Sequence, residues 1–386
     1  MDFALEKDQE LIKKSAREFF EKECPKDKVR ELREDPKGYD PNMWKKMTSL
    51  GFLGLIIPEQ YGGTEGEFID LMLFMEEIGR NLVPSPFFST VVLCGMPLME
   101  FGTNEQKDTF LPEIAEKGKI WSFAQTEQLA NHEPEDIKLK ATLDNDEYTL
   151  NGTKLFVPYA SAAKYFLVVA RTSEGENPEE GITLFIVDSK TDGIETEIIP
   201  TTARDVRCEV KFTNAKVPKK NILGEPDKGW KIVDYVFQNT AVLKAAEMSG
   251  GAQAAFSIVN KYAKERKQFD KPIGSLQAVQ FKLVDLLTDI DELKYLVHEA
   301  AWNINAGSPS RKLNSMAKAK ANAVYHDMCY HGIFLHGAIG WTEEMDIGLY
   351  HLRTRSLEFE GGGTDIHMEK IAKELESYQP DFLNLK

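Results

Sequence analysis

Glu247 is the residue in this sequence whose surroundings point most directly to acid–base chemistry. It lies in the stretch 245–251 (AAEMSGG), where its neighbours are small or apolar. Burying a carboxylate among such side chains disfavours the anion, so we predict that the pKa of Glu247 is raised. A raised pKa suits a general base that removes a proton from a weak carbon acid. The other interpretation is a buried glutamate that is hydrogen-bonded to a neighbouring helix or subunit.

Four further positions carry groups that could bind a ring-containing, phosphorylated ligand. Thr126 offers a hydroxyl that donates and accepts, and Phe156 offers a flat apolar surface. The guanidinium of Arg266 is a forked donor suited to pyrophosphate, and Gly337 lets a backbone approach phosphate oxygens closely. Taken alone, each residue is more often explained in an ordinary way, as a strand threonine, a core aromatic, a solvated helix arginine and a glycine at a helix end.

The composition of the chain excludes several classes of protein. Its 386 residues are 42% hydrophobic, which provides a large core and excludes a disordered or fibrous chain. A formal net charge of −15 repels nucleic acid and anionic lipid. The first twenty residues carry charge throughout and no later apolar run is long enough to cross a bilayer, so we expect a cytoplasmic protein that is not inserted in a membrane. The widely spaced cysteines predict reduced, mostly buried thiols, with neither a metal site nor a disulfide framework: Cys24, Cys94, Cys208 and Cys329.

Hydrophobic periodicity divides the chain into three segments. Residues 1–118 show helical spacing, most clearly at 11–20 and 71–78. Residues 119–228 carry short runs rich in branched side chains, and Asn145-Asp146 and Asn151-Gly152 are dipeptides that predict tight hairpins. The β-rich runs are 167–170, 182–187 and 194–199.

Residues 229–386 return to helical spacing, in stretches near 232–264, 276–306 and 310–335 that have the length of bundle helices. We therefore predict an α+β multidomain fold, with an N-terminal α-helical domain (1–118), a central antiparallel β domain (119–228) and a C-terminal four-helix-bundle-like domain (229–386). A strand, glycine-rich turn and helix with GxGxxG spacing is absent, so a Rossmann nucleotide site is not indicated.

Five local motifs, in this order, resemble the acyl-CoA dehydrogenase family along nearly the whole chain. They are PEQYGG with EEIGR (58–63 and 76–80), AQTE (124–127), LNGTK (150–154), ERKQF with the following PI and Q (265–277), and HGAIGWT (336–342). The resemblance implies the fold predicted above, FAD as cofactor, an acyl-CoA substrate and an electron-transfer flavoprotein as electron acceptor. It also implies a homotetramer or a heterotetramer.

The resemblance assigns a set of residues to the flavin. In the family, the positions of Arg266 and Gly337 belong to a neighbouring subunit's flavin. Pro158 stands where the family often has a threonine whose hydroxyl reaches flavin N5, and proline has neither a hydroxyl nor an N–H. The implied cofactor residues are Gln125, Thr126, Phe156, Pro158, Arg266, Gln268, Phe269, Gln277, His336, Gly337 and Thr364.

The carboxylate that the family's reaction needs is missing from its usual positions. Counting from Arg353 to Thr364 places Gly362 where most members have the glutamate of a YEGT motif. The position that a minority use, on the first long C-terminal helix, is occupied by Thr240. Glu247 lies seven residues later, two helical turns along the same face, and is our candidate base. The stretch around it resembles that of a subgroup acting on ring, branched or steroid-side-chain CoA esters.

Gly362 keeps a function that the resemblance implies, because its backbone N–H can still bind the thioester oxygen. Three readings of the chain remain open. It is an active dehydrogenase for a bulky, cyclic or branched acyl-CoA, a non-catalytic or assembly subunit of a mixed-subunit dehydrogenase, or an atypical lyase or oxidase on the same fold.

Overall fold

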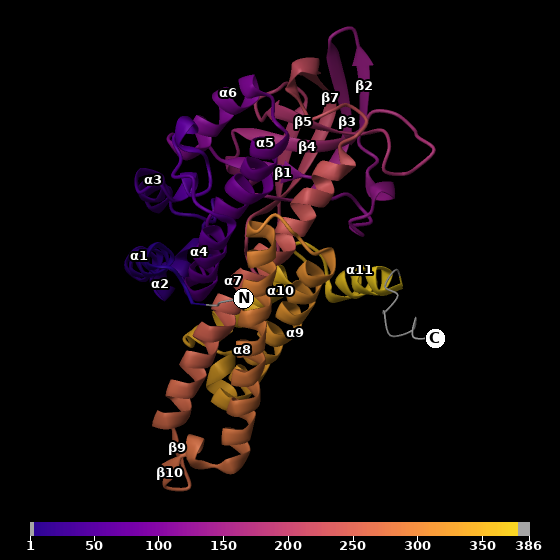
Figure 1. The fold of residues 1–386 in the computed structure, drawn as a ribbon. Coiled ribbons are helices and arrows are strands. Elements are labelled where there is room, and N and C mark those ends of the chain that lie inside the picture. Colours follow the sequence, from indigo (N-terminus) through magenta and orange to yellow (C-terminus); the bar gives the residue numbers. More distant parts are fainter. Residues whose placement is uncertain (1–3, 377–386) are drawn as a thin grey trace, which may run out of the picture. The chain divides into compact units, whose positions relative to one another are not determined.

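The computed structural model describes residues 4–376 and separates them into two compact units (Figure 1). Of the described residues, the helical unit contains 4–30, 67–83 and 240–376, and the β unit contains 31–66 and 84–239. Both units therefore draw on the N-terminal segment, and two of the divisions between them fall inside helices. The predicted domain boundaries at residues 118 and 228 stay predictions, because the two compact units are divided at other residues.

The β unit is built around one sheet with the strand order β6-β7-β3-β2-β4-β5-β8, and β1 also pairs with β4. Most neighbours are antiparallel, as predicted, but β4 pairs in parallel with β1 and β2, so the sheet is mixed. The strands are β1 (Trp121–Ala124), β2 (Lys140–Asp144), β3 (Glu147–Pro158), β4 (Tyr165–Arg171), β5 (Ile182–Asp188), β6 (Ile194–Ile199), β7 (Arg207–Pro218) and β8 (Ile222–Leu223). The three predicted β-rich runs became β4, β5 and β6.

One of the two predicted hairpins is confirmed and the other is wrong. Asn145, with φ of +55°, and Asp146 form the turn between β2 and β3. Asn151 and Gly152 instead lie inside β3, at a shift in its register with β7. The physical reason is packing, since a Cβ on Gly152 would lie 2.9 Å from the Cα of Leu139. The glycine permits a close approach within the sheet rather than a turn.

Helices precede the sheet in the β unit and make up most of the helical unit. In the β unit they are α3 (Pro41–Ser49), α5 (Met96–Phe101) and α6 (Asn104–Ala115), with short helical turns at Phe52–Gly54, Glu59–Tyr61 and Phe88–Gly95. α2 (Lys26–Glu34) and α7 (Trp230–Glu265) cross the boundary between the units. The helical unit holds α1 (Lys7–Glu23), α4 (Phe68–Asn81), α8 (Gln277–Asn305), α9 (Arg311–His336), α10 (Asp346–Leu357) and α11 (Thr364–Glu376).

The three long C-terminal helices match their predictions closely, and a two-stranded hairpin joins the first two of them. β9 (Lys267–Gln268) and β10 (Lys271–Pro272) pair antiparallel between the end of α7 and the start of α8. Figure 1 shows this hairpin at one tip of the helical unit. The cysteines are all buried, as predicted. Within residues 4–376, none of the helices combines the length and hydropathy needed to span a membrane.

α4 and α7 cross at glycines from two of the sequence motifs. A Cβ on Gly79 would overlap the carbonyl oxygen of Glu247, and a Cβ on Gly250 would overlap that of Glu76. The two backbones therefore touch directly, which only glycine allows. The EEIGR motif of α4 and the AAEMSGG stretch of α7 are thus two sides of one helix crossing.

Two buried glutamates of α4 are held by basic residues of α1. Arg17 binds both carboxylate oxygens of Glu77, at 2.7 and 2.9 Å. Glu76 accepts from Lys13 at 2.5 Å and from His298 of α8 at 3.1 Å. Burial opposes ionisation of Glu76, but the bond from His298 and the charge of Lys13 outweigh it and lower its pKa to about 2.

Acid should weaken the helical unit through Glu76. Its pKa is lower in the folded state than in the unfolded state, so its contribution is present above about pH 4.5 and is lost as the pH falls toward 2. The full contribution is about 3 kcal/mol, of which more than half is lost by about pH 3. Urea unfolding from pH 6 to pH 3 should show that loss in the wild-type chain and a shallower one in Glu76→Gln. Parallel pH profiles for the two proteins would contradict the assignment.

Candidate active site

Phe156 lies on β3 at a break in the ladder between β3 and β7. The register shifts between Lys154 and Val157, Phe156 has φ of +53°, and its side chain is 49% exposed. A bulky residue in the left-handed region costs free energy, and such strain gathers at functional sites. The bulge leaves the aromatic ring as an accessible flat surface on the β unit.

The segment after β1 is tied to the same part of β3. The backbone N–H of Leu155 donates to the carbonyl of Thr126 at 2.9 Å. The buried ammonium of Lys154 donates to the carbonyl of Gln125 at 2.9 Å and to Glu127 at 2.7 Å. Burial lowers the pKa of Lys154 to about 8, while the charge of Glu127 opposes that shift. The lysine of LNGTK and the glutamate of AQTE therefore form an ion pair, which sequence reasoning had not predicted.

These β-unit residues fit the ring of a flavin. Phe156 provides the apolar surface, and Thr126 lies on the adjoining segment with its hydroxyl as donor and acceptor. Gln125 is held beside it through its backbone. The carbonyl of Pro158 accepts from the hydroxyl of Ser122 at 2.6 Å, so this residue contributes to the strand framework and offers no side-chain donor.

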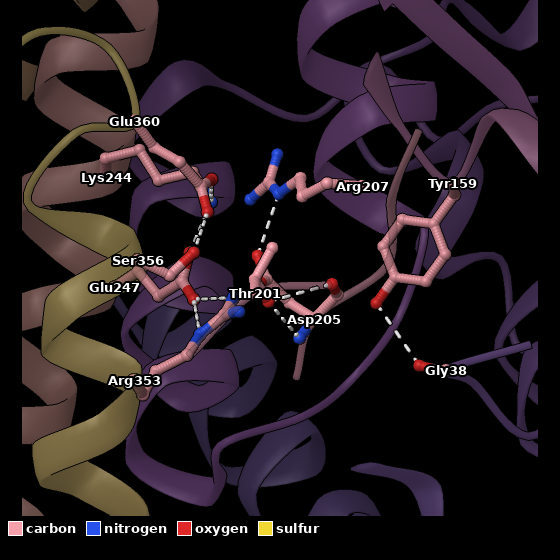
Figure 2. A network of polar contacts seen from close by, with 10 residues as sticks. All are labelled: Gly38, Tyr159, Thr201, Asp205, Arg207, Lys244, Glu247, Arg353, Ser356 and Glu360. Atoms are coloured by element: carbon pink, nitrogen blue, oxygen red, sulfur yellow. Dashed lines mark hydrogen bonds and ion pairs between the residues drawn. The ribbon is translucent and has the colours of Figure 1, made fainter. Parts of the chain in front are cut away.

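Glu247, in the helical unit, has the opposite environment to the one predicted. Its side chain is buried, but Oε2 accepts from Lys244 at 2.8 Å and Oε1 from Arg353 at 2.6 and 3.2 Å. Figure 2 shows the carboxylate between these two cations. Burial by itself would raise the pKa of Glu247, but the charges of Lys244 and Arg353 outweigh it, so the pKa is lowered. The predicted rise was wrong because Arg353 is remote in sequence and the prediction did not weigh Lys244, which lies three residues before Glu247.

The two positions at which the family carries its base are close together in the helical unit. A Cβ on Gly361 would lie 2.5 Å from Cγ2 of Thr240 on α7. Gly361 and Gly362 have φ of +74° and +104°, a region that side chains rarely adopt. A glutamate at residue 362 would therefore be strained on this backbone. The hydroxyl of Thr240 is buried and has no hydrogen-bond partner.

The backbone N–H of Gly362, which the resemblance assigns to a thioester oxygen, has a partner within the chain in this structure. It donates to the carbonyl of Phe359 at 3.2 Å, so binding a substrate there requires this long bond to open. Lys318 of α9 stabilises the loop that contains Gly362. Its ammonium donates to the carbonyls of Leu357 and Gly362 at 3.0 and 3.2 Å.

Lys318 also fixes the start of α11. It donates to Oδ1 of Asn322 at 2.6 Å, and Nδ2 of Asn322 donates to the hydroxyl of Thr364 at 3.2 Å. Burial lowers the pKa of Lys318 to about 7. Thr364, implied as a flavin contact, thus already has a protein partner that orients its hydroxyl.

Glu360 is a carboxylate at this place that sequence reasoning missed. Its Oε2 lies 2.7 Å from Nζ of Lys244, and its Oε1 accepts from the hydroxyl of Ser356 at 3.2 Å. Figure 2 shows Glu360 and Glu247 on either side of Lys244. The count from Arg353 placed the expected glutamate at residue 362, and the glutamate two residues before it was passed over. A carboxylate adjoining the glycine run was the available signal.

The remaining implied cofactor residues lie at another part of the helical unit. Arg266, Gln268 and Phe269 are exposed around the β9–β10 hairpin, and the exposed Gln277 begins α8. From Thr240 to Arg266 along α7 is roughly 39 Å, at 1.5 Å per residue. The structure therefore does not bring these residues together with Thr364 within one helical unit.

His336 and Gly337 lie with that second group. The ring of His336 stacks on Tyr262, one turn before Arg266, with centroids 4.1 Å apart. Nδ1 of His336 donates to the carbonyl of Gly332 at 2.7 Å, and Nε2 is buried with no partner. Gly337 ends α9 with φ of +69° and has open space around its Cα. The arrangement leaves a backbone that a phosphate group can approach.

Comparisons with known proteins agree with this architecture over most of the described chain. Models of the acyl-CoA dehydrogenase N-terminal, middle and C-terminal domains match residues 6–118, 122–215 and 227–376. A probable acyl-CoA dehydrogenase of Bacillus subtilis is 33% identical over 383 residues, covering 97% of this chain and 100% of that protein.

Two further relatives extend the comparison to a complex and to a solved structure. A caffeyl-CoA reductase–Etf complex subunit of Acetobacterium woodii is 32% identical over 342 residues, covering 87% of this chain and 90% of that protein. The structure of butyryl-CoA dehydrogenase from Megasphaera elsdenii superimposes with a TM-score of 0.91 at 30% identity, covering 97% of this chain and 100% of that one. This chain belongs to the acyl-CoA dehydrogenase family and is an FAD-dependent oxidoreductase of acyl-CoA thioesters.

Proposed function

We propose that this chain dehydrogenates a CoA thioester whose acyl group is branched or ring-containing. Removal of the α-proton requires a carboxylate, and bound FAD supplies the acceptor for the hydride that leaves the neighbouring carbon. The observation that supports catalysis is the pair of carboxylates, Glu247 and Glu360, on Lys244 beside Thr240. The choice of acyl group rests on the likeness of residues 245–252 to the subgroup that acts on such esters.

We propose an electron-transfer flavoprotein as the partner that reoxidises the enzyme. The relative from Acetobacterium woodii is named as a subunit of a reductase–Etf complex, which supports such a partner here. That name also describes a reductase, so the direction of the reaction is tested together with the substrate. The partner should accelerate turnover without changing which thioesters react.

A panel of CoA thioesters tests the proposal directly. The FAD-loaded protein is mixed anaerobically with saturated linear, branched and ring-containing thioesters, and the flavin absorbance is followed. Branched or ring-containing thioesters should bleach the flavin fastest, and the matching unsaturated thioesters should reoxidise the reduced protein. Faster bleaching by a linear thioester would reject the proposed acyl group, and absence of bleaching by every thioester would reject the dehydrogenase function.

The second candidate function is that of a non-catalytic or assembly subunit in a mixed-subunit enzyme. It is supported by the absence of a carboxylate at Thr240 and at Gly362, and by the separation of roughly 39 Å along α7 between the two groups of cofactor residues. A second copy or a related subunit would have to bring the second group to a flavin. Exposed apolar side chains on the helical unit support such assembly, among them Phe281, Phe334 and Trp341, which are 66, 73 and 72% exposed.

Flavin stoichiometry and mass separate these two candidates. We expect a purified homotetramer with one FAD per chain if the chain is an enzyme by itself. A chain that binds less than one FAD, and gains flavin and activity only with a second gene product, would favour the assembly role. Light scattering for mass and absorbance of released flavin measure both quantities on the same sample.

A further inference from the structure

We propose that Glu360 is the carboxylate that removes the α-proton, with Lys244 as the residue that positions it. The inference rests on the proposed dehydrogenase function. It names a base in place of the carboxylate that is missing at Thr240 and at Gly362. It stands on the contacts of Glu360 within the helical unit and on the difference between its surroundings and those of Glu247.

The location of Glu360 is the first argument. It directly precedes Gly361, whose Cα faces the side chain of Thr240. Lys244 lies four residues after Thr240 on α7, one helical turn along the same face. Because Oε2 of Glu360 lies 2.7 Å from Nζ of Lys244, its carboxylate lies over the face of α7 that carries Thr240. Glu360 thus contacts a residue of α7 one turn from Thr240 and directly precedes the glycine run that contains residue 362.

Accessibility is the second argument. The side chain of Glu247 is 2% exposed, and each of its oxygens accepts a bond from a cation at 2.6 to 2.8 Å. The side chain of Glu360 is 16% exposed, and its Oε1 accepts a bond from the hydroxyl of Ser356 at 3.2 Å. A base needs a lone pair that a substrate carbon can approach, and Glu360 meets that requirement better.

Charge balance in the cluster is the third argument. In the proposed step the α-C–H bond breaks, an O–H bond forms on Glu360, and the electron pair of the broken bond enters the new Cα=Cβ bond. FAD, when bound, would accept the hydride that leaves the β-carbon. Glu360 becomes neutral, but Lys244 keeps Glu247 as its counter-ion at 2.8 Å. The buried ammonium is therefore never left without an anion, which would otherwise oppose the proton transfer. Glu247, held also by Arg353, is the fixed partner of this cluster.

Exchange of the α-proton with solvent tests the inference separately from redox turnover. A saturated thioester that bleaches the flavin is incubated in D2O with wild type, Glu360→Gln, or Glu358→Gln, and α-deuterium is measured by NMR. Glu358 is the matched control, because its side chain is 30% exposed, lies in the same turn and has a long ion pair with Arg355, at 3.9 Å. We expect exchange to fall about 100-fold or more in Glu360→Gln and to stay within about twofold in Glu358→Gln.

A labelling experiment on the wild-type protein makes the test independent of whether a variant folds. An alkynoyl-CoA, whose activated triple bond traps a nearby carboxylate as an ester, is added and the modified peptide is mapped by mass spectrometry. Modification of Glu360 supports the inference, and modification of Glu247 overturns it. Wild-type exchange rates in folded, FAD-loaded Glu360→Gln would overturn it as well, while the proposed function stands. If no thioester exchanges its α-proton or bleaches the flavin with the wild-type protein, the proposed function and the role of Glu360 fail together.

Discussion

Gly250→Ala should lower the free energy of unfolding by about 3 kcal/mol and the thermal midpoint by roughly 5 °C or more. The added methyl would overlap the carbonyl of Glu76 on α4, so the two helices must separate along their crossing. Alanine is the better helix former by about 1 kcal/mol, which only partly offsets that cost. Gly79→Ala should behave alike, because its methyl would overlap the carbonyl of Glu247 from the other helix.

Gly348→Ala is the matched control for this prediction. Gly348 lies in α10, and the nearest atom to an added Cβ would be the carbonyl oxygen of Thr342 at 3.7 Å, an ordinary contact. We expect its unfolding midpoint to equal or slightly exceed that of the wild type. Thermal and urea unfolding of the three variants provide the comparison. Equal midpoints for Gly250→Ala and Gly348→Ala would mean that α4 and α7 are not in backbone contact.

Arg353→Met and Glu247→Gln are each expected to destabilise the chain by about 3 kcal/mol. Removing one member of a buried ion pair leaves the other incompletely compensated, which costs about 3–5 kcal/mol. The lower end applies because Lys244 remains with Glu247 when Arg353 is removed, and Glu360 remains with Lys244 when Glu247 is neutralised. Loss of Arg353 should also raise the pKa of Glu247, because one of the two charges that lower it is gone.

A double variant gives the coupling between these two residues. If Glu247 and Arg353 stabilise the fold mainly through each other, Glu247→Gln with Arg353→Met should cost clearly less than the sum of the single changes. Additive losses in urea unfolding at pH 7 would show that the pair contributes little as a pair. Lys320→Met serves as the exposed control, since Asp289 and Glu292 bind it near the surface, and it should cost less than about 1 kcal/mol.

The stability experiment also bears on the choice of base. Of the two interpretations of Glu247, the contacts favour the buried glutamate bonded to its neighbours, because two cations hold it ionised and cover both oxygens. A strong stability loss in Glu247→Gln would agree with that role. Its catalytic role is tested separately, by the peptide that the alkynoyl-CoA modifies.

The sequence by itself determined the order and type of the main elements. The helical spacing of 232–264, 276–306 and 310–335 predicted α7, α8 and α9 almost to their ends, because bundle helices of that length carry a sustained apolar face. The motifs, in order, also identified the family that the comparisons confirm. Short-range signals were less certain. Asn145 formed the predicted turn. Gly152 instead packs closely against Leu139 on a neighbouring segment and forms no turn.

Only the tertiary structure decided the chemistry of the carboxylates. The letters around Glu247 are apolar, yet Arg353, 106 residues later in the chain, lies 2.6 Å from it and lowers its pKa together with Lys244. The count along the chain passed over Glu360, which became a candidate base only when the structure showed its contact with Lys244. The physical reason is that a pKa depends on charges within a few ångströms in space, and folding brings those charges from residues that are remote in sequence.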